Sequence, residues 1–396
     1  MFGFLCYTPA MLFWKLVGGV VAKVGLGFSL LFSPGTPLPL WPMPSTPLVL
    51  APHTEEIANS EQAETEKIES ETPESKPITI PKPQPIAVPI PSPVEAPTPQ
   101  PVSPPQPVQV HLPPGSNLND ATRDALVNIL CITKAGGYLK PISGSGVIVD
   151  SHGIVLTNAH VGQFFLLRNY TVKDNVTCTI RTGSPARNLY TAELLYLPPT
   201  WIAANARKIV QEVPTGTGRN DYAFLRITGR TDPAASLPPS FPFIPPTLRD
   251  PVIGEGVLLA GYPAGFIEGE TVQTNLYSSS AKTSISAIYT FEEGGGSDLI
   301  SVGGTILSQH GSSGGVVVTT QEASAIGTIV TATDGVTTAE RDLRAITFRH
   351  IDESYRRETG EGLNDLFSSD FAQKASIFNL TIVPSLSRAL IDELEK

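Results

Sequence analysis

Residues 299–320 of the 396-residue chain, LISVGGTILSQHGSSGGVVVTT, place a serine among glycines directly before a run of β-branched residues. The run from 316 to 320 predicts a strand, and residues 311–315 (GSSGG) predict a tight loop in front of it. The glycine two residues before Ser313 lets the backbone turn so that its amide and the serine's own amide point into one hole. Glycine-rich loops often precede strands, so this motif alone does not identify a function.

Two further motifs carry residues that could act together with this serine. Residues 157–161 (TNAHV) end a predicted strand with His160, and residues 220–227 (NDYAFLRI) alternate apolar and polar side chains behind Asp221. Alone, His160 fits a buried core histidine and Asp221 fits a turn residue. A hydroxyl nucleophile, however, needs an adjacent base, and a histidine base needs an acid on its other nitrogen. The order His, Asp, Ser with long separations is one of the known solutions to this geometry.

The surrounding sequence predicts many short strands and little helix. Asn119 is expected to cap a short helix through Leu126, and residues 127–133 are expected to form a strand. Residues 145–150 and 153–158 predict two further strands joined by a turn. This pattern is typical of an antiparallel barrel or sandwich, and the roughly 280 residues after Pro114 are enough for a large core.

Together these motifs resemble a trypsin-like serine protease of the chymotrypsin fold, closest to the bacterial HtrA-type branch. The resemblance covers roughly residues 125–350 and is carried by SGSGVIVDSHGIVLTNAHV, NDYAFLRI, GEGVLLAGYPAGF, LISVGGTILSQHGSSGGVVV and AIGTIV. It implies a mostly β protein with two six-stranded antiparallel β-barrels, a few peripheral helices and an active site in the cleft between the barrels. No PDZ-like domain is expected after residue 350, so the peptide sensing of HtrA proteins is not implied.

The resemblance also assigns roles to individual residues. It implies that Ser313 is the nucleophile, that His160 is the general base and that Asp221 orients His160. The amides of Gly311 and Ser313 would form the oxyanion hole. The chain would then be a serine endopeptidase that hydrolyses polypeptide substrates through an acyl-enzyme. The alternative is a catalytically silent protein-binding module on the same fold, and the presence of all three side chains argues against it.

Substrate preference is weakly encoded. By analogy with the family, Leu307 would form the floor of the primary pocket, which favours an apolar or small substrate side chain. His310 is expected either to contact substrate or to be an exposed loop histidine. Gly327 would let a substrate strand pair with the nearby strand edge. Ser312 stands where trypsin has aspartate, so activation by a buried new amino terminus is not expected.

The remaining composition excludes several classes of function. The net charge of −10 argues against nucleic acid as a partner. The six histidines are scattered, with no pairs at ligand spacing, so neither a metal nor another cofactor is expected. Cys131 and Cys178 both lie on predicted strands, and buried free thiols are favoured over a disulfide.

Residues 1–33 are almost wholly apolar, with Lys15 and Lys23 as their charged residues. They predict a single-pass membrane anchor; a cleaved secretory signal and a buried core helix are the alternatives. Because no Lys or Arg follows until Lys67, the amino terminus is expected in the cytoplasm and the protease domain outside it, periplasmic or extracellular. If the signal is cleaved, the protein would be secreted.

Residues 34–114 hold 23 of the 38 prolines and a glutamate-rich patch. Proline fixes φ and lacks an amide donor, so this segment predicts a disordered, extended polyproline II spacer. A docking tract for proline-binding modules is the alternative. An anchor followed by such a spacer also suits a TonB-like force-transmitting protein, but the large motif-bearing domain at 115–350 does not.

Two segments outside the main motifs predict helices. Ile202, Ala206, Ile209 and Val210 lie at helical spacing, which indicates a surface helix or, alternatively, a substrate-contacting flap. Residues 351–396 predict a helical tail packed on the protease domain, with helices at 352–360, 362–375 and 385–395. The last helix would begin at Ser385 and place Leu386, Leu390 and Leu394 on one face, which also allows self-association. The sequence does not determine the oligomeric state.

Overall fold

The computed structural model describes residues 117–134, 139–211, 216–368 and 370–396. The predicted anchor (1–33) and the predicted spacer (34–114) lie outside these ranges. Within the ranges, no helix combines the length and the apolar character that crossing a membrane requires.

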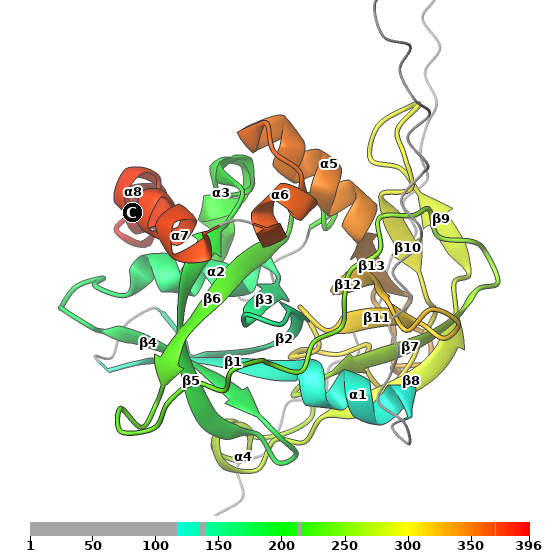
Figure 1. Ribbon diagram of the computed structural model, residues 1–396, viewed down its shortest axis with the longest axis horizontal. Helices are drawn as coiled ribbons and strands as arrows, with labels where there is room; N and C mark the ends of the chain where they lie inside the picture. Colours follow the sequence, from blue (N-terminus) through cyan, green and yellow to red (C-terminus); the bar gives the residue numbers. More distant parts are fainter. Residues whose placement is uncertain (1–116, 135–138, 212–215, 369) are drawn as a thin grey trace, which may run out of the picture. The chain divides into compact units, whose positions relative to one another are not determined.

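The first half of the domain is a closed antiparallel barrel with the strand order β1-β2-β3-β6-β5-β4 (Figure 1). Its strands are β1 (Leu126–Thr133), β2 (Ile142–Asp150), β3 (Ile154–Thr157), β4 (Val176–Thr182), β5 (Arg187–Tyr196) and β6 (Ala223–Arg230). Strands β1, β2, β3 and β6 are formed by the apolar segments for which strands were predicted from the sequence. Their side chains, among them Val127, Ile148 and Leu156, are almost completely buried, so the barrel is closed around an apolar core.

The second half is a seven-stranded sheet with the order β8-β7-β11-β12-β13-β10-β9, and not the six-stranded barrel that the resemblance implied. Its strands are β7 (Gly256–Gly261), β8 (Ser279–Ser284), β9 (Ala287–Tyr289), β10 (Leu299–Ser301), β11 (Val316–Thr319), β12 (Ala325–Ala332) and β13 (Leu343–Thr347). The two end strands, β8 and β9, are separated in the chain by Ile285 and Ser286 alone. Ile285 donates its N–H to Glu255 on one side and Ser286 donates to Ser301 on the other, both over about 3 Å. One bent segment, residues 279–289, therefore supplies both end strands of the sheet. Because this segment is divided into two strands, the sheet has seven strands where six were expected.

The helix before the first barrel, α1 (Leu118–Ala125), begins earlier than predicted. Its N-cap is Asn117, whose side-chain oxygen accepts from the N–H of Asp120 at 2.9 Å. Asn119 is not the cap; its side chain instead accepts a hydrogen bond from Ser280 of β8 at 2.6 Å. The helix thereby joins the start of the first barrel to the second sheet.

A disulfide joins Cys131 of β1 to Cys178 of β4, so the prediction of free thiols was wrong. The antiparallel pairing of β1 and β4 sets these two residues directly opposite each other, with their Cα atoms 4.0 Å apart. Residues opposite each other in an antiparallel pair come close enough for a bridge. The register in which β1 and β4 pair therefore determines whether the disulfide can form. The spacing of the two cysteines in the sequence does not reveal this register.

Removing this disulfide is expected to destabilise the protein. It links residues 47 apart, and closing a loop of that size typically stabilises a fold by about 2–4 kcal/mol. The double variant Cys131→Ala/Cys178→Ala should therefore unfold at a lower guanidinium concentration than the wild type. Adding reductant should lower the midpoint of the wild type and leave that of the double variant unchanged. Equal midpoints for all samples would contradict the expectation.

Short helices connect the strands, and longer ones follow them. The connecting helices are α2 (Ala159–Gly162), η1 (Gln163–Leu167), α3 (Pro199–Asn205), η2 (Ala206–Val210) and α4 (Gly269–Thr274). After β13 come α5 (Phe348–Thr359), α6 (Leu363–Ser368), α7 (Phe371–Thr381) and α8 (Val383–Leu394). α5 ends at Gly360 as predicted, but it begins at Phe348, ahead of the predicted start at residue 352. The segment predicted as one helix at 362–375 is divided between α6 and α7.

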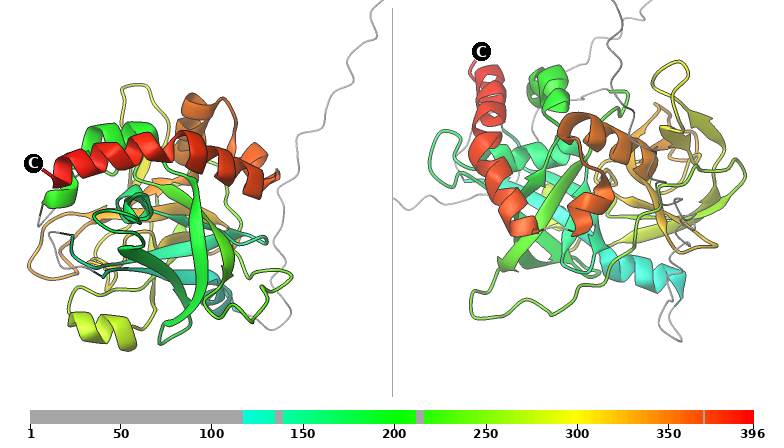
Figure 2. Two further views of the ribbon diagram at one scale, coloured as in Figure 1. Left: turned by 90° about the vertical axis from the view of Figure 1, so that its left-hand side faces the viewer. Right: turned by 45° about the horizontal axis from the view of Figure 1, so that its top comes forward.

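The last two helices lie across the outside of the first barrel (Figure 2). α7 packs on β5, and Asn379 donates to the carbonyl of Leu194 at 2.7 Å. α8 packs on α3, η1 and η2, and Ser387 donates to the carbonyl of Leu166 at 2.7 Å. α8 begins at Val383, ahead of the predicted cap Ser385, and its three leucines are buried as predicted. This apolar face is covered by the chain itself.

Candidate active site

The pairing of β3 with β6 brings the histidine and aspartate motifs together. The two strands are antiparallel, with Thr157 opposite Ala223 at the end of the ladder. Continuing this register by two residues places the start of α2 beside Asp221. His160 follows within one turn of α2, so residues separated by 61 positions become neighbours.

The carboxylate of Asp221 holds His160 through two hydrogen bonds. Oδ1 accepts from the backbone N–H of His160 at 2.9 Å, and Oδ2 lies 2.8 Å from the ring nitrogen Nδ1. The Asp221 side chain is 11% exposed and that of His160 is 33% exposed. In the described part of the chain nothing bonds to Nε2, so this nitrogen remains available for proton transfer.

This contact also changes the protonation of the imidazole. Burial acts to lower the pKa of His160, because a charged ring loses its hydration. The negative charge of Asp221 and its hydrogen bond to the ring outweigh burial and raise the pKa of His160 above its ordinary value of 6.5. The pair is therefore arranged to accept a proton on the ring and to stabilise the resulting imidazolium.

Several backbone contacts fix the position of the pair. Asp221 donates its N–H to the carbonyl of Gly218 at 3.1 Å, and its own carbonyl accepts from the side chain of Asn158 at 2.9 Å. Asn220, directly before it, has a φ of 56°, in the left-handed region that non-glycine residues rarely adopt. On the histidine side, Gln163 donates to the carbonyl of His160 at 2.9 Å.

The loop at residues 311–315 requires its glycines. Gly311 and Gly314 have φ values of 88° and 85°. A Cβ on Gly311 would lie 2.6 Å from the carbonyl oxygen of Tyr262, and one on Gly314 would lie 2.0 Å from that of Ser145. Backbone packs too closely here for any side chain, so the loop can hold this conformation only with glycine.

Ser145 of β2 anchors this loop from the first barrel. Its N–H donates to the carbonyl of Ser313 at 2.8 Å, and its hydroxyl donates to the carbonyl of Gly311 at 2.7 Å. The same hydroxyl accepts from the N–H of Tyr262 at 2.8 Å. Among the described residues, the N–H groups of Gly311 and Ser313 find no acceptor. Both donors are thus available to an incoming group.

His160, Asp221 and Ser313 all line one cleft of about 1700 Å³ between the two halves of the domain. One wall comes from α2, α3 and η2 of the first half and the other from the 308–311 loop and the end of β12. Lys208 and Val210 belong to the first wall. The segment predicted as a surface helix therefore borders the cleft, which agrees with the alternative of a substrate-contacting flap.

The predicted substrate-binding residues occupy different environments. His310 is exposed and lines the cleft. Leu307 is fully buried in the core of the second sheet and does not line the cleft. Gly327 is buried inside β12 and faces Val317 of β11 on one side and Thr347 of β13 on the other, so it offers no free edge.

Among the described residues, β12 has a free edge on its β11 side that begins at residue 330. The pairing with β11 ends at Thr328, whereas Thr331 and Ala332 still pair with β13. Residues 329–333 line the cleft. This edge could not be predicted from the sequence, because a strand has the same residue pattern whether one or both of its neighbouring strands are present.

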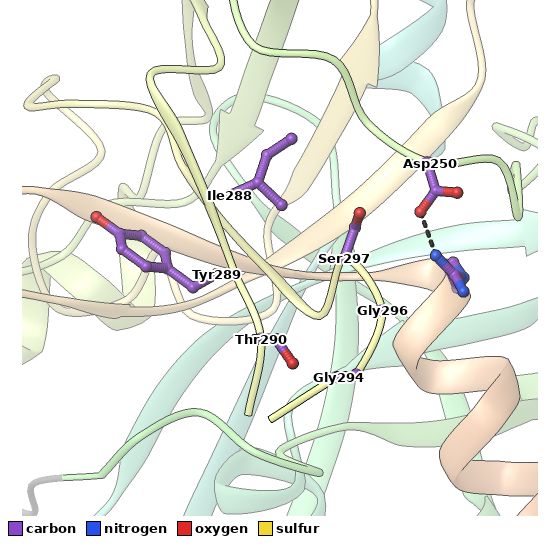
Figure 3. A pocket seen from close by; sticks show the side chains of 9 residues that line it. Asp250, Ile288, Tyr289, Thr290, Gly294, Gly296 and Ser297 are labelled. Atoms are coloured by element: carbon purple, nitrogen blue, oxygen red, sulfur yellow. Dashed lines mark hydrogen bonds and ion pairs between the residues drawn. The ribbon is translucent and has the colours of Figure 1, made fainter. Parts of the chain in front are cut away.

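A second, smaller hollow of about 500 Å³ lies on the second sheet (Figure 3). The residues that line it include Thr290, Ser297 and the ion pair of Asp250 with Arg349. The charges of Asp250 and Arg349 neutralise each other, and among the described residues that line this hollow there is no histidine beside a hydroxyl. In the described ranges, no group of three His, Cys, Asp or Glu side chains could hold a metal ion. The large cleft is therefore the candidate active site.

Residues 144–327 match the family model described as trypsin-like peptidase domain. No curated protein sequence matches the chain. The serine endoprotease from Yersinia pestis is similar in structure, with 21% identity over 63% of this chain and 70% of that chain and a TM-score of 0.38. A protease from M. tuberculosis in its active form has 18% identity over 60% of this chain and 82% of that chain and a TM-score of 0.37.

Proposed function

We propose, from the premise that residues 144–327 form a trypsin-like peptidase domain, that the protein is a serine endopeptidase. Ser313 is the nucleophile, His160 the general base and Asp221 the residue that orients the base. The observation that carries the proposal is the contact of Asp221 with both the ring and the backbone of His160, in the same cleft as a glycine-flanked serine.

The reaction follows from these groups. The hydroxyl oxygen of Ser313 attacks the carbonyl carbon of a peptide bond while Nε2 of His160 takes its proton. The amides of Gly311 and Ser313 stabilise the negative charge on the carbonyl oxygen. The carbon–nitrogen bond then breaks, and the departing amine takes the proton from His160. Water, deprotonated by His160, releases the acyl group and regenerates Ser313.

The free edge of β12 is suited to bind the substrate backbone. A peptide in extended conformation can add to the edge at residues 330–332 as a further strand, using main-chain hydrogen bonds. Side chains of the peptide would then alternate between the cleft and solvent. His310 borders the same cleft and can contact the residues next to the cleaved bond.

The proposal includes a location outside the cytoplasm. The disulfide of Cys131 with Cys178 supports an oxidising compartment, because such bonds rarely persist where thiols are kept reduced. The apolar segment 1–33 would tether the protein to the membrane, and the proline-rich segment 34–114 would act as the spacer. Membrane fractionation of cells expressing the full chain tests this tether; recovery of an intact chain free of membranes would contradict it.

The experiment for the enzymatic proposal is labelling of the full chain with a fluorophosphonate probe, which reacts with activated serines. Wild type should be labelled and Ser313→Ala should not. Ser312→Ala is the matched control, since it removes a neighbouring buried hydroxyl that has no hydrogen-bond partner in the described chain, and it should still be labelled. Absence of labelling in the folded wild type would favour the silent binding module, and labelling of Ser313→Ala would refute the assignment.

The labelling rate should depend on pH in a direction set by His160. The base must be neutral to take the proton of Ser313, and Asp221 raises the pKa of His160 above 6.5. The rate should therefore rise with pH, with its midpoint above 6.5. Stopped-time labelling between pH 5 and 9 measures the midpoint. A rate independent of pH across this range would contradict His160 as the base.

A further inference from the structure

The domain contains a second histidine–aspartate pair, which is buried and contacts Asn220, the residue that precedes Asp221. Nδ1 of His350 lies 3.0 Å from Oδ1 of Asp298, and the two side chains are 3% and 8% exposed. The other ring nitrogen of His350, Nε2, lies 3.1 Å from the side-chain oxygen of Asn220. Asn220 directly precedes Asp221. The pair from the second sheet thus reaches the residue beside the carboxylate that holds His160.

The fold holds His350 and Asp298 rigidly. β10 pairs with β13 so that Asp298 lies beside Thr347, whose N–H donates to the Asp298 carbonyl at 3.0 Å. The hydroxyl of Thr347 caps α5 by accepting from the N–H of His350 at 3.0 Å. These contacts place the imidazole at the first turn of α5, where it can reach across to the first barrel.

The Asp298 carboxylate is itself fixed on its other oxygen. Oδ2 accepts from the N–H of Phe291 at 2.7 Å and from the hydroxyl of Thr290 at 3.1 Å. Thr290 also lines the smaller hollow of Figure 3. With both of its oxygens bonded, Asp298 cannot turn away from His350, which gives the imidazole one defined orientation.

Asn220 has a left-handed backbone with a φ of 56°. Asparagine adopts this region at a lower cost than other residues with a Cβ, and the contacts of its side chain and backbone stabilise the turn further. The side chain of Asn220 meets His350, and its carbonyl accepts from the N–H of Tyr222 at 2.9 Å. The turn from Gly218 to Asn220 sets the direction in which the next residue, Asp221, presents its carboxylate to His160.

We infer that His350, oriented by Asp298, is a positioning residue that holds Asn220 and thereby aims Asp221 at His160. The inference rests on the proposed function, because it concerns the same catalytic pair. On this inference, residues next to the second sheet help to set the geometry of His160, which lies on the first barrel. His350 is buried and does not line the cleft, so its effect would reach His160 through Asn220.

The test measures the fluorophosphonate labelling rate of the full chain against pH for His350→Ala and Asn220→Gly. Glycine adopts the left-handed conformation freely, so Asn220→Gly removes the contact without straining the turn. Both variants should label about 10–100-fold more slowly, since small misplacements of catalytic groups cost rates of this order. The pH midpoint should also fall, because a loosened Asp221 no longer opposes the effect of burial on His160.

The matched control is His152→Ala. Nδ1 of His152 lies 2.7 Å from Asp150, so the chemistry is the same, but this pair is exposed on the turn between β2 and β3. The labelling rate of His152→Ala and the pH midpoint of that rate should equal those of the wild type. The groups facing His350 that could shift its own titration are Asp298, Arg357 and Arg219. Titration of His350 itself is therefore followed separately by NMR of the ring protons.

A His350→Ala variant that is less stable to heat but keeps the wild-type rate and midpoint would overturn the inference, because that is the signature of a purely structural residue. If His350→Ala does not fold, Asn220→Gly decides on the same criteria. If the wild type is not labelled at all, the proposed function fails. The inference is then decided by the low-field NMR signal of the Nδ1 proton of His160, which should weaken in Asn220→Gly and whose persistence unchanged would overturn it.

Discussion

Replacing Asp221 with asparagine is expected to slow the reaction of Ser313 by about 10⁴-fold, the scale seen when a triad loses its carboxylate. The carboxylate accepts hydrogen bonds from both the N–H and the Nδ1–H of His160. An asparagine can accept on one atom only, and its NH₂ group favours the tautomer with the proton on Nε2. That nitrogen would then be unable to take the proton of Ser313.

Rates of fluorophosphonate labelling for wild type and Asp221→Asn measure this effect directly. The residual rate should have a lower pH midpoint than the wild type, because the charge that raises the pKa of His160 is absent. Asp150→Asn is the matched control, since it alters the exposed pair of Asp150 with His152. A loss below tenfold in folded Asp221→Asn would show that the carboxylate is not part of the catalytic group.

Replacing Gly314 with alanine is expected to destabilise the fold by about 3 kcal/mol or more, or to prevent folding. Two costs combine at this position. The φ of 85° is unfavourable for any residue with a Cβ, and that Cβ would lie 2.0 Å from the carbonyl oxygen of Ser145. Because Ser145 also bonds to Ser313 and Gly311, relief of the clash would move the loop at residues 311–315.

Gly254→Ala separates these two costs. Gly254 has a φ of 86°, but a Cβ there would meet nothing within 4 Å. This control carries the conformational cost alone, about 1–2 kcal/mol. Guanidinium unfolding of the two variants and the wild type gives the difference. Equal destabilisation by both substitutions would contradict the close packing of Gly314 on Ser145.

Sequence reasoning found the residues that gather in the cleft because each of them sits in a local motif. The alternation of apolar and polar residues after Asp221 predicted the strand that is β6 in the structure. The glycines at residues 311–315 predicted a tight loop. The pairing of β3 with β6 places His160 beside Asp221. This proximity was expected from the order of the three motifs along the chain. The first barrel also formed as the resemblance implied.

Features that depend on pairing between distant strands could not be predicted from the sequence. The register of β1 with β4 decides the Cys131–Cys178 disulfide, and the length of β11 decides which part of β12 has a free edge. The contact of His350 with Asp298 joins residues 52 apart that carry no motif. In each case the residue types are visible in the sequence, but the contact between them depends on how distant segments pair in the fold.

The position of α7 and α8 has a consequence for the order of folding. A ribosome releases the strands of the first barrel before those of the second sheet, and domains generally fold in that order. Here the outer side of the first barrel, including η1 directly after the helix of His160, is covered by residues 371–394. That covering segment is synthesised after both sheets. The packing on the outer side of the first barrel, next to the candidate active site, can therefore be completed only after residues 371–394 have been synthesised.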